Sequence, residues 1–335
     1  MVSRVLKLKI IEEESTASNI AKFIEETIQE WELERFGKII ILSDNAAEMK
    51  RGITEAGHVF IGCMCHRYNL LINWTIDNSP VFKKLIEKSK KISTKFKTSY
   101  KLNNMLTEIQ NEMYGDYLLM INESITRWFS EMKLVDRVII NSEVTNGIVL
   151  ALSEKYENDD LRRCFLEDYY LTDGEINLLK FLVKSLNKIE EESLILEKDT
   201  ESTLSYVIPG YYCLKNYYDE LLNSIENNDE NYDNICISIT YGNQIFRSFE
   251  EYESSIIENK NNISIELDHE MIETNEIKRN FIENIIEGLD KKFIEENNIL
   301  ENEEILLSTC LNPCFKMDFF EENEKRIIRE YFEKN

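Results

Sequence analysis

The chain has 335 residues, 43% hydrophobic and 10% aromatic, so it is long and apolar enough to bury a core and is not a disordered protein. Its formal net charge of -24 argues against a whole surface that binds nucleic acid, because phosphate binding depends on Lys and Arg. The apolar runs are far shorter than the roughly 20 residues of a membrane span, and the N-terminus shows no signal peptide, so we expect a soluble, intracellular protein without a membrane partner.

Charge is unevenly spread along the chain, and the cysteines are scattered. The segment 83–101 carries eight lysines and one acid, whereas the segment 217–306 carries 23 acids and six basic residues. An anionic ligand would therefore be met by the first half of the chain. The seven cysteines show no disulfide-framework spacing, and their odd number favours free thiols in a reducing compartment.

The first third of the chain predicts alternating strands and helices. Residues 4–11, "RVLKLKII", have the pattern of a strand. The segment "STASNIAKFIEETIQEWEL" predicts an amphipathic helix with an N-cap candidate, and Gly37 is predicted to end it. The run "KIIIL" is almost wholly apolar, which is typical of a central strand covered on both faces. These patterns predict an α/β unit.

Asp44 and Asn45 follow that apolar run. A short helix, "AAEMKRG", is then predicted to end at Gly52, and "HVFIGC" predicts a second short strand before a helix that begins near Cys65. This order of elements implies strands that pair in parallel through crossover connections.

From Ser79 and Pro80 onward the patterns are helical. Ser79 is a candidate N-cap with proline in the first turn, and Thr172 and Glu175 have the spacing of a capping box before a long apolar stripe. Helical patterns continue to about residue 300, interrupted by polar loops near 223–235 and 258–264. The second part is therefore predicted to be all-α.

Several blocks, in order, resemble the hAT superfamily of transposases, which includes the Activator and Hermes elements and proteins of the BED zinc finger family domesticated from them. The matching text is "ESTASNIA", "SDNAAEM", "CMCHRYNL", "SITRWFSEMKLVDR", "LTDGEINLLKFLVKSLNKIEEES" and "STCLNPCFKMDFF". The matches run from about residue 4 to 320.

The resemblance implies a fold that agrees with the patterns above: a partial RNase H-like sheet of about three parallel strands, followed by a large helical insertion, and mostly helical overall. We expect a partial RNase H-like domain at 1–80, an all-α insertion domain at 81–300 and a return segment at 301–335. The resemblance also implies that the family's first Asp strand, its final Glu and its dimerisation region lie outside this chain, which would be truncated at both ends.

The implied chemistry is cut-and-paste DNA transposition, in which several carboxylates hold two Mg²⁺ ions. Asp44 would be a remnant of that catalytic set, so the fragment is expected to be inactive and to bind Mg²⁺ weakly at most. An Asp after a strand is equally an ordinary cap for the next helix, and the two readings of Asp44 stay open.

The resemblance places Cys63 and His66 close to the catalytic centre as the family's Cys-x-x-His. We expect His66 to be buried and hydrogen-bonded. Cys63 and His66, together with His58 and Cys65, have the residue types of four zinc ligands. A closed structural zinc site usually takes its ligands from two well-separated pairs, so we expect no zinc here. A cysteine at a strand end is also commonly a small buried hydrophobe.

The resemblance further suggests DNA contacts. Arg127 and Trp128 match the family's Arg-Trp pair, which grips an extruded base; the alternative is a tryptophan in the core. Lys90, Lys91, Lys95 and Lys97 suit a helix that faces DNA, or simply a solvated helix face.

The resemblance therefore implies a transposase-derived, nuclear, DNA-binding protein. The implied partner is terminal-inverted-repeat DNA, and the resemblance is also compatible with a homo-oligomer among full-length relatives. The alternative is a domesticated module that binds nucleic acid or protein in nuclear regulation.

Overall fold

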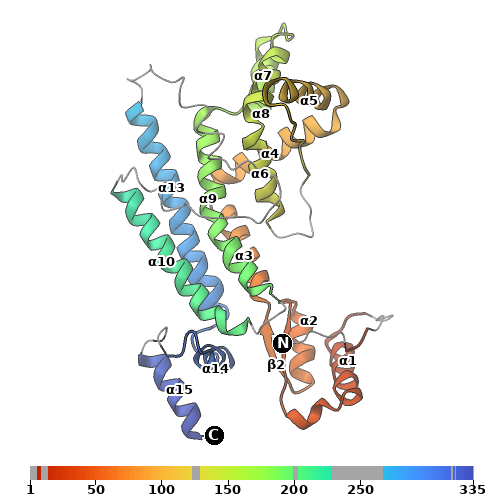
Figure 1. Ribbon diagram of the computed structural model, residues 1–335, viewed down its shortest axis with the longest axis vertical. Helices are drawn as coiled ribbons and strands as arrows, with labels where there is room; N and C mark the ends of the chain where they lie inside the picture. Colours follow the sequence, from red (N-terminus) through yellow and green to blue (C-terminus); the bar gives the residue numbers. More distant parts are fainter. Residues whose placement is uncertain are drawn as a thin grey trace. The chain divides into compact units, whose positions relative to one another are not determined.

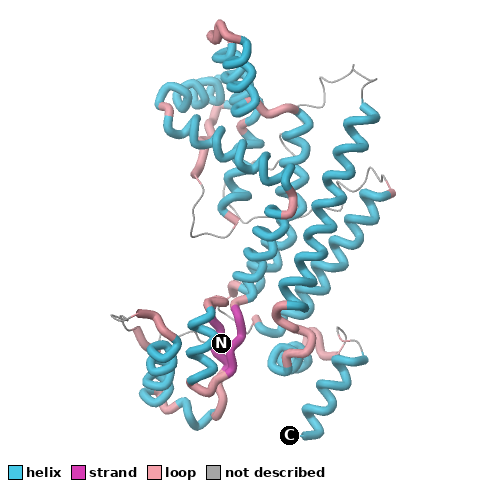
Figure 2. The backbone as a smooth tube through the Cα atoms, turned by 180° about the vertical axis from the view of Figure 1, so that it is seen from behind, coloured by secondary structure: helices cyan, strands magenta, loops and turns pink. Residues whose placement is uncertain are grey.

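The structure is a computed structural model that describes residues 6–8, 14–122, 129–198, 203–227, 267–317, 320 and 322–334. It is mostly helical, as the sequence predicts (Figures 1 and 2). Within these residues the strands form one two-stranded parallel sheet, β1 (Ile40–Ser43) and β2 (Val59–Gly62). No helix in the described ranges has the length and apolar character needed to cross a membrane.

The chain divides into two compact units, and the first is discontinuous. Unit 1 comprises residues 1–71, 189–214 and 289–335, and unit 2 comprises residues 72–188 and 215–288. The chain thus leaves unit 1 twice to build unit 2. Besides the sheet, unit 1 contains α1 (Ala17–Glu30), η1 (Leu33–Phe36), α2 (Ala47–Glu55), η2 (Leu204–Tyr206), the π-helix η4 (Asp290–Glu295), α14 (Glu303–Leu311) and α15 (Glu322–Lys334).

Unit 2 is helical throughout its described residues. It contains α4 (Pro80–Thr98), α5 (Tyr100–Tyr114), α6 (Ser130–Ile140), α7 (Ser142–Ser153) and α8 (Asp159–Tyr169). Four helices contribute residues to both units: α3 (Met64–Asp77), α9 (Asp173–Leu196), α10 (Val207–Glu226) and α13 (Leu267–Leu289).

Helix α1 confirms its prediction from local pattern. The Asn19 N–H donates to the Thr16 hydroxyl at 3.4 Å, so Thr16 is the N-cap, and the buried side chains include those of Ile20 and Ile28. The helix lies beside α2 (Figure 1), and the Ala17 N–H donates to the Glu48 carboxylate of α2 at 2.9 Å. A carboxylate at a helix N-terminus is favoured by the helix dipole, so this bond joins the two helices.

Two predicted helix ends were wrong. Helix α1 ends at Glu30, and the short helix η1 then precedes Gly37, whose φ of 71° is accessible to glycine at little cost. Helix α2 continues past Gly52 to Glu55. Gly52 is not a terminator; it is a contact point, buried where α2 meets α1.

The strand β1 is not covered on both faces. Ile40 is 42% exposed and Leu42 is 54% exposed, so the apolar run "KIIIL" does not form the buried central strand that the sequence predicts. The strand predicted at residues 4–11 falls mostly outside the described residues, and its residues 6–8 have no regular secondary structure. The described residues thus show two parallel strands, and an RNase H-like sheet of about three strands stays a prediction.

The core of unit 2 is aromatic. The rings of Phe82 and Phe281 lie 4.4 Å apart between centroids, with Phe181 6.3 Å from Phe82, and all three are buried. The Tyr218 hydroxyl of α10 donates to the Ser185 carbonyl of α9 at 2.7 Å, which satisfies a polar group in that core.

The capping box predicted at the start of α9 is present. The Thr172 N–H donates to the Glu175 carboxylate at 2.9 Å, and the Glu175 N–H donates to the Thr172 hydroxyl at 3.2 Å. The same carboxylate accepts two hydrogen bonds from the Lys88 ammonium of α4, at 2.7 and 2.8 Å. One carboxylate thus both caps α9 and ties α9 to α4.

We expect Gly52→Ala to destabilise the protein by about 1 to 3 kcal/mol, because overpacking a tight contact has that cost. A Cβ on Gly52 would lie 2.7 Å from the Ile20 side chain and 2.8 Å from the Ala17 carbonyl oxygen. Thermal and urea unfolding measure the change. The matched control is Gly147→Ala in α7, where a Cβ meets nothing within 4 Å; it should stabilise by up to about 1 kcal/mol. Equal effects at the two glycines would contradict the packing explanation.

Candidate functional site

The candidate site lies at the carboxyl ends of the two parallel strands. Ser43 pairs with Gly62 in the sheet, and the Cys63 N–H donates to the Ser43 carbonyl at 2.7 Å. Asp44 and Asn45 follow one strand, and Cys63 follows the other. Side chains that follow adjacent parallel strands meet at one sheet edge, where α/β proteins commonly bind ligands.

Asp44 is exposed and takes part in the turn before α2. Its carboxylate accepts a hydrogen bond from the Ala46 N–H at 3.3 Å, whereas the N-cap position itself belongs to Ala46. The alternative in which Asp44 caps the next helix is wrong, because Asp44 supports the turn two residues ahead, and its role as a metal-ligand remnant stays a prediction.

A two-Mg²⁺ centre does not fit the donors present around Asp44. Such a centre needs a cluster of carboxylates, and the described residues contain no group of three or more His, Cys, Asp and Glu side chains that could hold a metal ion. We therefore derive no metal-dependent step from this site. His58, Cys63, Cys65 and His66 likewise do not form such a group within the described residues.

Arg67 is buried directly behind this edge and is the residue that sequence patterns missed. Arg67 is 7% exposed. The guanidinium Nη2 donates to the Asn45 side-chain oxygen at 3.1 Å, but its Nε and the Asn45 Nδ2 are buried without a hydrogen-bond partner. Burial lowers the pKa of Arg67 to about 10, opposed by the charges of Glu296 and Cys63.

Gly62 makes room for this arrangement. A Cβ on Gly62 would lie 2.0 Å from the Asn45 side-chain oxygen and 2.6 Å from Arg67 Nη2. The last residue of β2 must therefore be glycine for the asparagine and the guanidinium to meet. A signal for Arg67 was present in the sequence, because it follows Met64 by three residues, in register with the buried stripe of Met64, Tyr68 and Leu71.

Cys63 occupies the N-cap position of α3. Its carbonyl accepts the first helical hydrogen bond, from the Arg67 N–H at 3.3 Å, and its side chain is half-buried. Cys65 is buried, and its thiol donates to the Ser193 carbonyl of α9 at 3.7 Å. His66 is half-buried, whereas we expect a buried side chain from the sequence.

The Cys63 thiol is acidic for structural reasons. The hydrogen bond with the Cys65 thiol is the largest cause, and the backbone N–H groups of His66 and Cys65 add to it; burial acts in the opposite direction. Together these interactions lower the pKa of Cys63 from 9.0 to about 6. The interaction with Cys63 and burial both raise the pKa of Cys65. Cys63 is therefore the thiol that ionises first, and Cys65 stays protonated.

The lysines proposed to bind DNA lie on α4, and several are already paired. The Lys91 ammonium lies 2.6 Å from the Asp168 carboxylate, and Lys90 forms an ion pair with Glu131. Lys95 lies over the Tyr169 ring, 5.4 Å from its centroid. Lys95 and Lys97 are exposed, and neither makes an ion pair within the described part of unit 2. The local positive charge of the sequence is thus partly neutralised in the fold.

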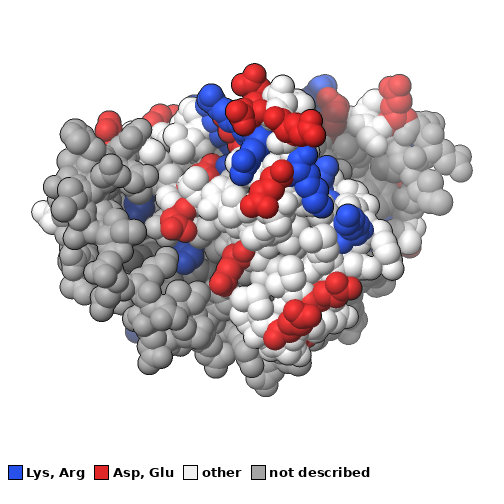
Figure 3. All heavy atoms as spheres, turned by 90° about the horizontal axis from the view of Figure 1, so that it is seen from above, with Lys and Arg blue, Asp and Glu red and all other residues white. Residues whose placement is uncertain are grey.

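The surface charges are mixed on the face drawn in Figure 3, where Lys and Arg side chains lie among Asp and Glu. Arg127 and Trp128 lie outside the described residues, so the structure does not place the predicted base-gripping pair. Of the candidate DNA-binding residues, Lys95 and Lys97 are the exposed cations on α4 that keep their charge available.

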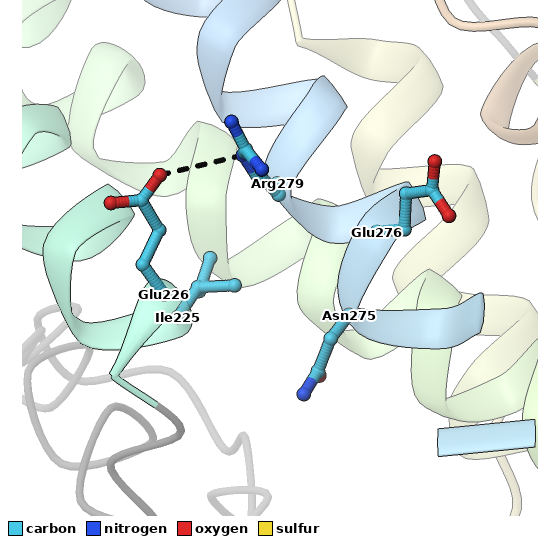
Figure 4. Close-up of a pocket in the computed structure, with 5 residues that line it drawn as sticks. All are labelled: Ile225, Glu226, Asn275, Glu276 and Arg279. Atoms are coloured by element: carbon cyan, nitrogen blue, oxygen red, sulfur yellow. Dashed lines mark ion pairs between the residues drawn. The ribbon is translucent and has the colours of Figure 1, made fainter. Parts of the chain in front are cut away.

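A second candidate is an open hollow of about 440 Å³ in unit 2, between the end of α10 and α13 (Figure 4). It is lined by Ile225, Glu226, Asn275, Glu276 and Arg279. Arg279 points toward Glu226, at 3.5 Å, and also pairs with Glu283 at 3.0 Å, while Asn275 and Glu276 point in different directions. Its one cation is already paired and its polar groups do not converge, so the hollow has no evident chemistry.

Comparison with known proteins gives no family. No family model matches the chain, and no curated protein matches it.

We expect the Cys63 thiolate to make stability depend on pH between about 6 and 9. Because its pKa is lower in the folded state, the unfolded chain binds more protons in this range, so stability rises with pH and is lost as pH falls through 6. For one proton the slope is at most about 1.4 kcal/mol per pH unit, and smaller here because solvent screens a half-buried thiolate.

Unfolding of the wild type, Cys63→Ala and Cys164→Ala at a series of pH values tests this expectation. Cys164 is exposed on α8, so its removal should leave the slope unchanged, whereas Cys63→Ala should flatten it. Parallel pH profiles for all three proteins would show that Cys63 does not carry the charge.

Proposed function

We propose that the chain is a hAT transposase-derived protein that binds DNA and whose ancestral role was cut-and-paste DNA transposition. The observation that carries the proposal is the order of parts around the interrupted unit 1. A parallel strand-helix-strand segment, with Asp44 directly after its first strand, is followed by an all-helical unit, and the chain then returns to unit 1. The family's RNase H-like domain with a helical insertion has this order of parts. The motif order in the sequence is the second support.

The proposed contact surface is the C-terminal half of α4. Lys95 and Lys97 lie in its last turn, where cations are favoured by the helix dipole, and both are exposed. Lys88, Lys90 and Lys91 face acids of neighbouring helices in the same unit and have less charge to offer a phosphate. Binding is therefore expected to be weak and independent of base sequence at these positions.

Fluorescence anisotropy with a short mixed-sequence DNA duplex, at salt concentrations from about 50 to about 200 mM, tests the proposal. We expect affinity to fall with salt, and Lys95→Gln/Lys97→Gln to reduce the slope of log affinity against log salt by about 2, since each phosphate contact contributes about 0.9. The matched control is Lys38→Gln/Lys50→Gln, which neutralises two exposed lysines of unit 1 and should leave the slope unchanged.

Absent or salt-independent binding would reject the DNA-binding proposal. The alternative of a protein-binding module in nuclear regulation would then stand. Equal losses in the two double variants would show that binding follows net charge and not the α4 surface.

We expect no Mg²⁺-dependent strand cleavage that requires Asp44. A single exposed carboxylate that already accepts an N–H bond is a poor holder of two ions. Conversion of supercoiled to nicked plasmid in Mg²⁺ or Mn²⁺ measures this for the wild type and Asp44→Ala. Nicking by the wild type that disappears in Asp44→Ala, with folding preserved by circular dichroism, would make the chain an active nuclease.

A further inference from the structure

The start of α3 carries a pair of thiols in unequal surroundings. Cys63 is half-buried at the N-cap, where backbone N–H groups of Cys65 and His66 donate to its sulfur. Orphan N–H groups and the helix dipole at such a position favour an anion, and for a cysteine that anion is the thiolate. The position therefore favours the reactive form of Cys63.

A second, independent observation concerns Arg67, one turn further along α3. A buried guanidinium needs a compensating anion, yet Arg67 makes no ion pair with a carboxylate within the described part of unit 1, and its only hydrogen bond there is to an amide oxygen. Two negative charges act on it, that of Glu296 and, more weakly, that of the Cys63 sulfur. A thiolate at Cys63 therefore favours the charged form of the buried Arg67.

Cys65 supplies a partner thiol two residues further along the chain. Its S–H donates to the Ser193 carbonyl of α9 at 3.7 Å. Cys65 is 6% exposed, so solutes reach Cys63 first. Alpha carbons two residues apart at the start of a helix lie about 5.5 Å apart, within the span that a disulfide bridges.

We propose that Cys63 and Cys65 form a redox-active dithiol, in which Cys63 attacks hydrogen peroxide and Cys65 is the resolving thiol. In the first step the Cys63 thiolate attacks one peroxide oxygen, the O–O bond breaks, and the leaving hydroxide takes up a proton to give water; Cys63 becomes a sulfenic acid. In the second step the Cys65 sulfur attacks the Cys63 sulfur, the S–O bond breaks, and the Cys65 proton leaves with the hydroxyl as water. One peroxide is reduced to two waters and the dithiol is oxidised to a disulfide.

Disulfide formation has structural consequences within unit 1. Cys65 must release the Ser193 carbonyl, which loses its sulfur donor, and Arg67 loses the thiolate charge beside it. Both changes remove stabilising interactions at the junction of β2 with α3. Oxidation should therefore lower the unfolding temperature reversibly, and reduction with a dithiol should restore it.

Peptide mass spectrometry can follow the reaction in the full chain. Trypsin releases residues 52–67 with Cys63 and Cys65 as its only cysteines, and residues 164–180 with Cys164 alone. The reduced protein, in EDTA at neutral pH, is treated with hydrogen peroxide with or without dimedone. We expect the 52–67 peptide of the wild type to lose two hydrogens, Cys65→Ser to accumulate a dimedone adduct at Cys63, and Cys63→Ser to show neither.

Cys164 is the internal control, because it is exposed but lies in the middle of α8, away from a helix N-terminus. Cys63 should be oxidised about tenfold faster than Cys164, since reactivity follows thiolate content more than exposure. Arg67→Met should slow the reaction of Cys63 several-fold, and Arg67→Lys should restore part of it. Circular dichroism and unfolding temperature verify that each variant is folded.

Several outcomes would overturn the proposal: faster oxidation of Cys164 than of Cys63, no dimedone adduct in folded Cys65→Ser, or a wild-type disulfide that links other cysteines. If Arg67→Met alone proves unfolded, the comparison of Cys63 with Cys164 in the wild type still decides whether Cys63 is the reactive thiol. The experiment is independent of DNA binding, so failure of one proposal leaves the other intact.

Discussion

The hydrogen bond from the Cys63 N–H to the Ser43 carbonyl closes the ladder between the two parallel strands, and the chemistry of unit 1 depends on it. It fixes the register in which Asn45 and Gly62 face one another. It also brings the end of β2 to the start of α3, so that the first turn of that helix points its backbone donors at a cysteine. A slip of one residue would exchange the two faces of β2 and separate these groups.

Arg67 gives this edge an electrostatic character that its acidic residue alone would not. A buried cation with one amide partner costs desolvation energy, and neutral replacements of buried charges are often at least as stable. Its presence at a strand edge beside a thiol is easier to explain by function than by stability. The polar atoms left without partners there, Arg67 Nε and Asn45 Nδ2, belong to the same small region.

Local features were predictable from the sequence, and features that depend on distant segments were not. The Thr16 cap and the Thr172–Glu175 capping box involve residues three apart, so a short pattern is sufficient to find them. The exposure of β1 depends on which elements cover it, and an apolar run cannot report that. The lysine run looked like a positive surface because the acids that pair with it, such as Asp168, lie on other helices.

The candidate site shows the same division. The pattern around Asp44 and Cys63 correctly indicated two strand ends and a helix start, because those follow from hydrophobic period and turn residues. The burial of Arg67 depends on which side of α3 faces the sheet, and the acidity of Cys63 depends on donors and a neighbouring thiol that only the fold brings together.

Glu175 has two roles, and this affects how any measurement at its neighbours must be interpreted. It accepts the Thr172 N–H that begins α9 and also holds the Lys88 ammonium of α4 with 15% of the lysine side chain exposed. Loss of the cap frees the carboxylate to rotate, and loss of the lysine removes the group that orients it. The free-energy changes of substitutions at Thr172 and Lys88 are therefore not additive. A double-mutant cycle would show a coupling between the start of α9 and a lysine that lies 84 positions earlier in the chain.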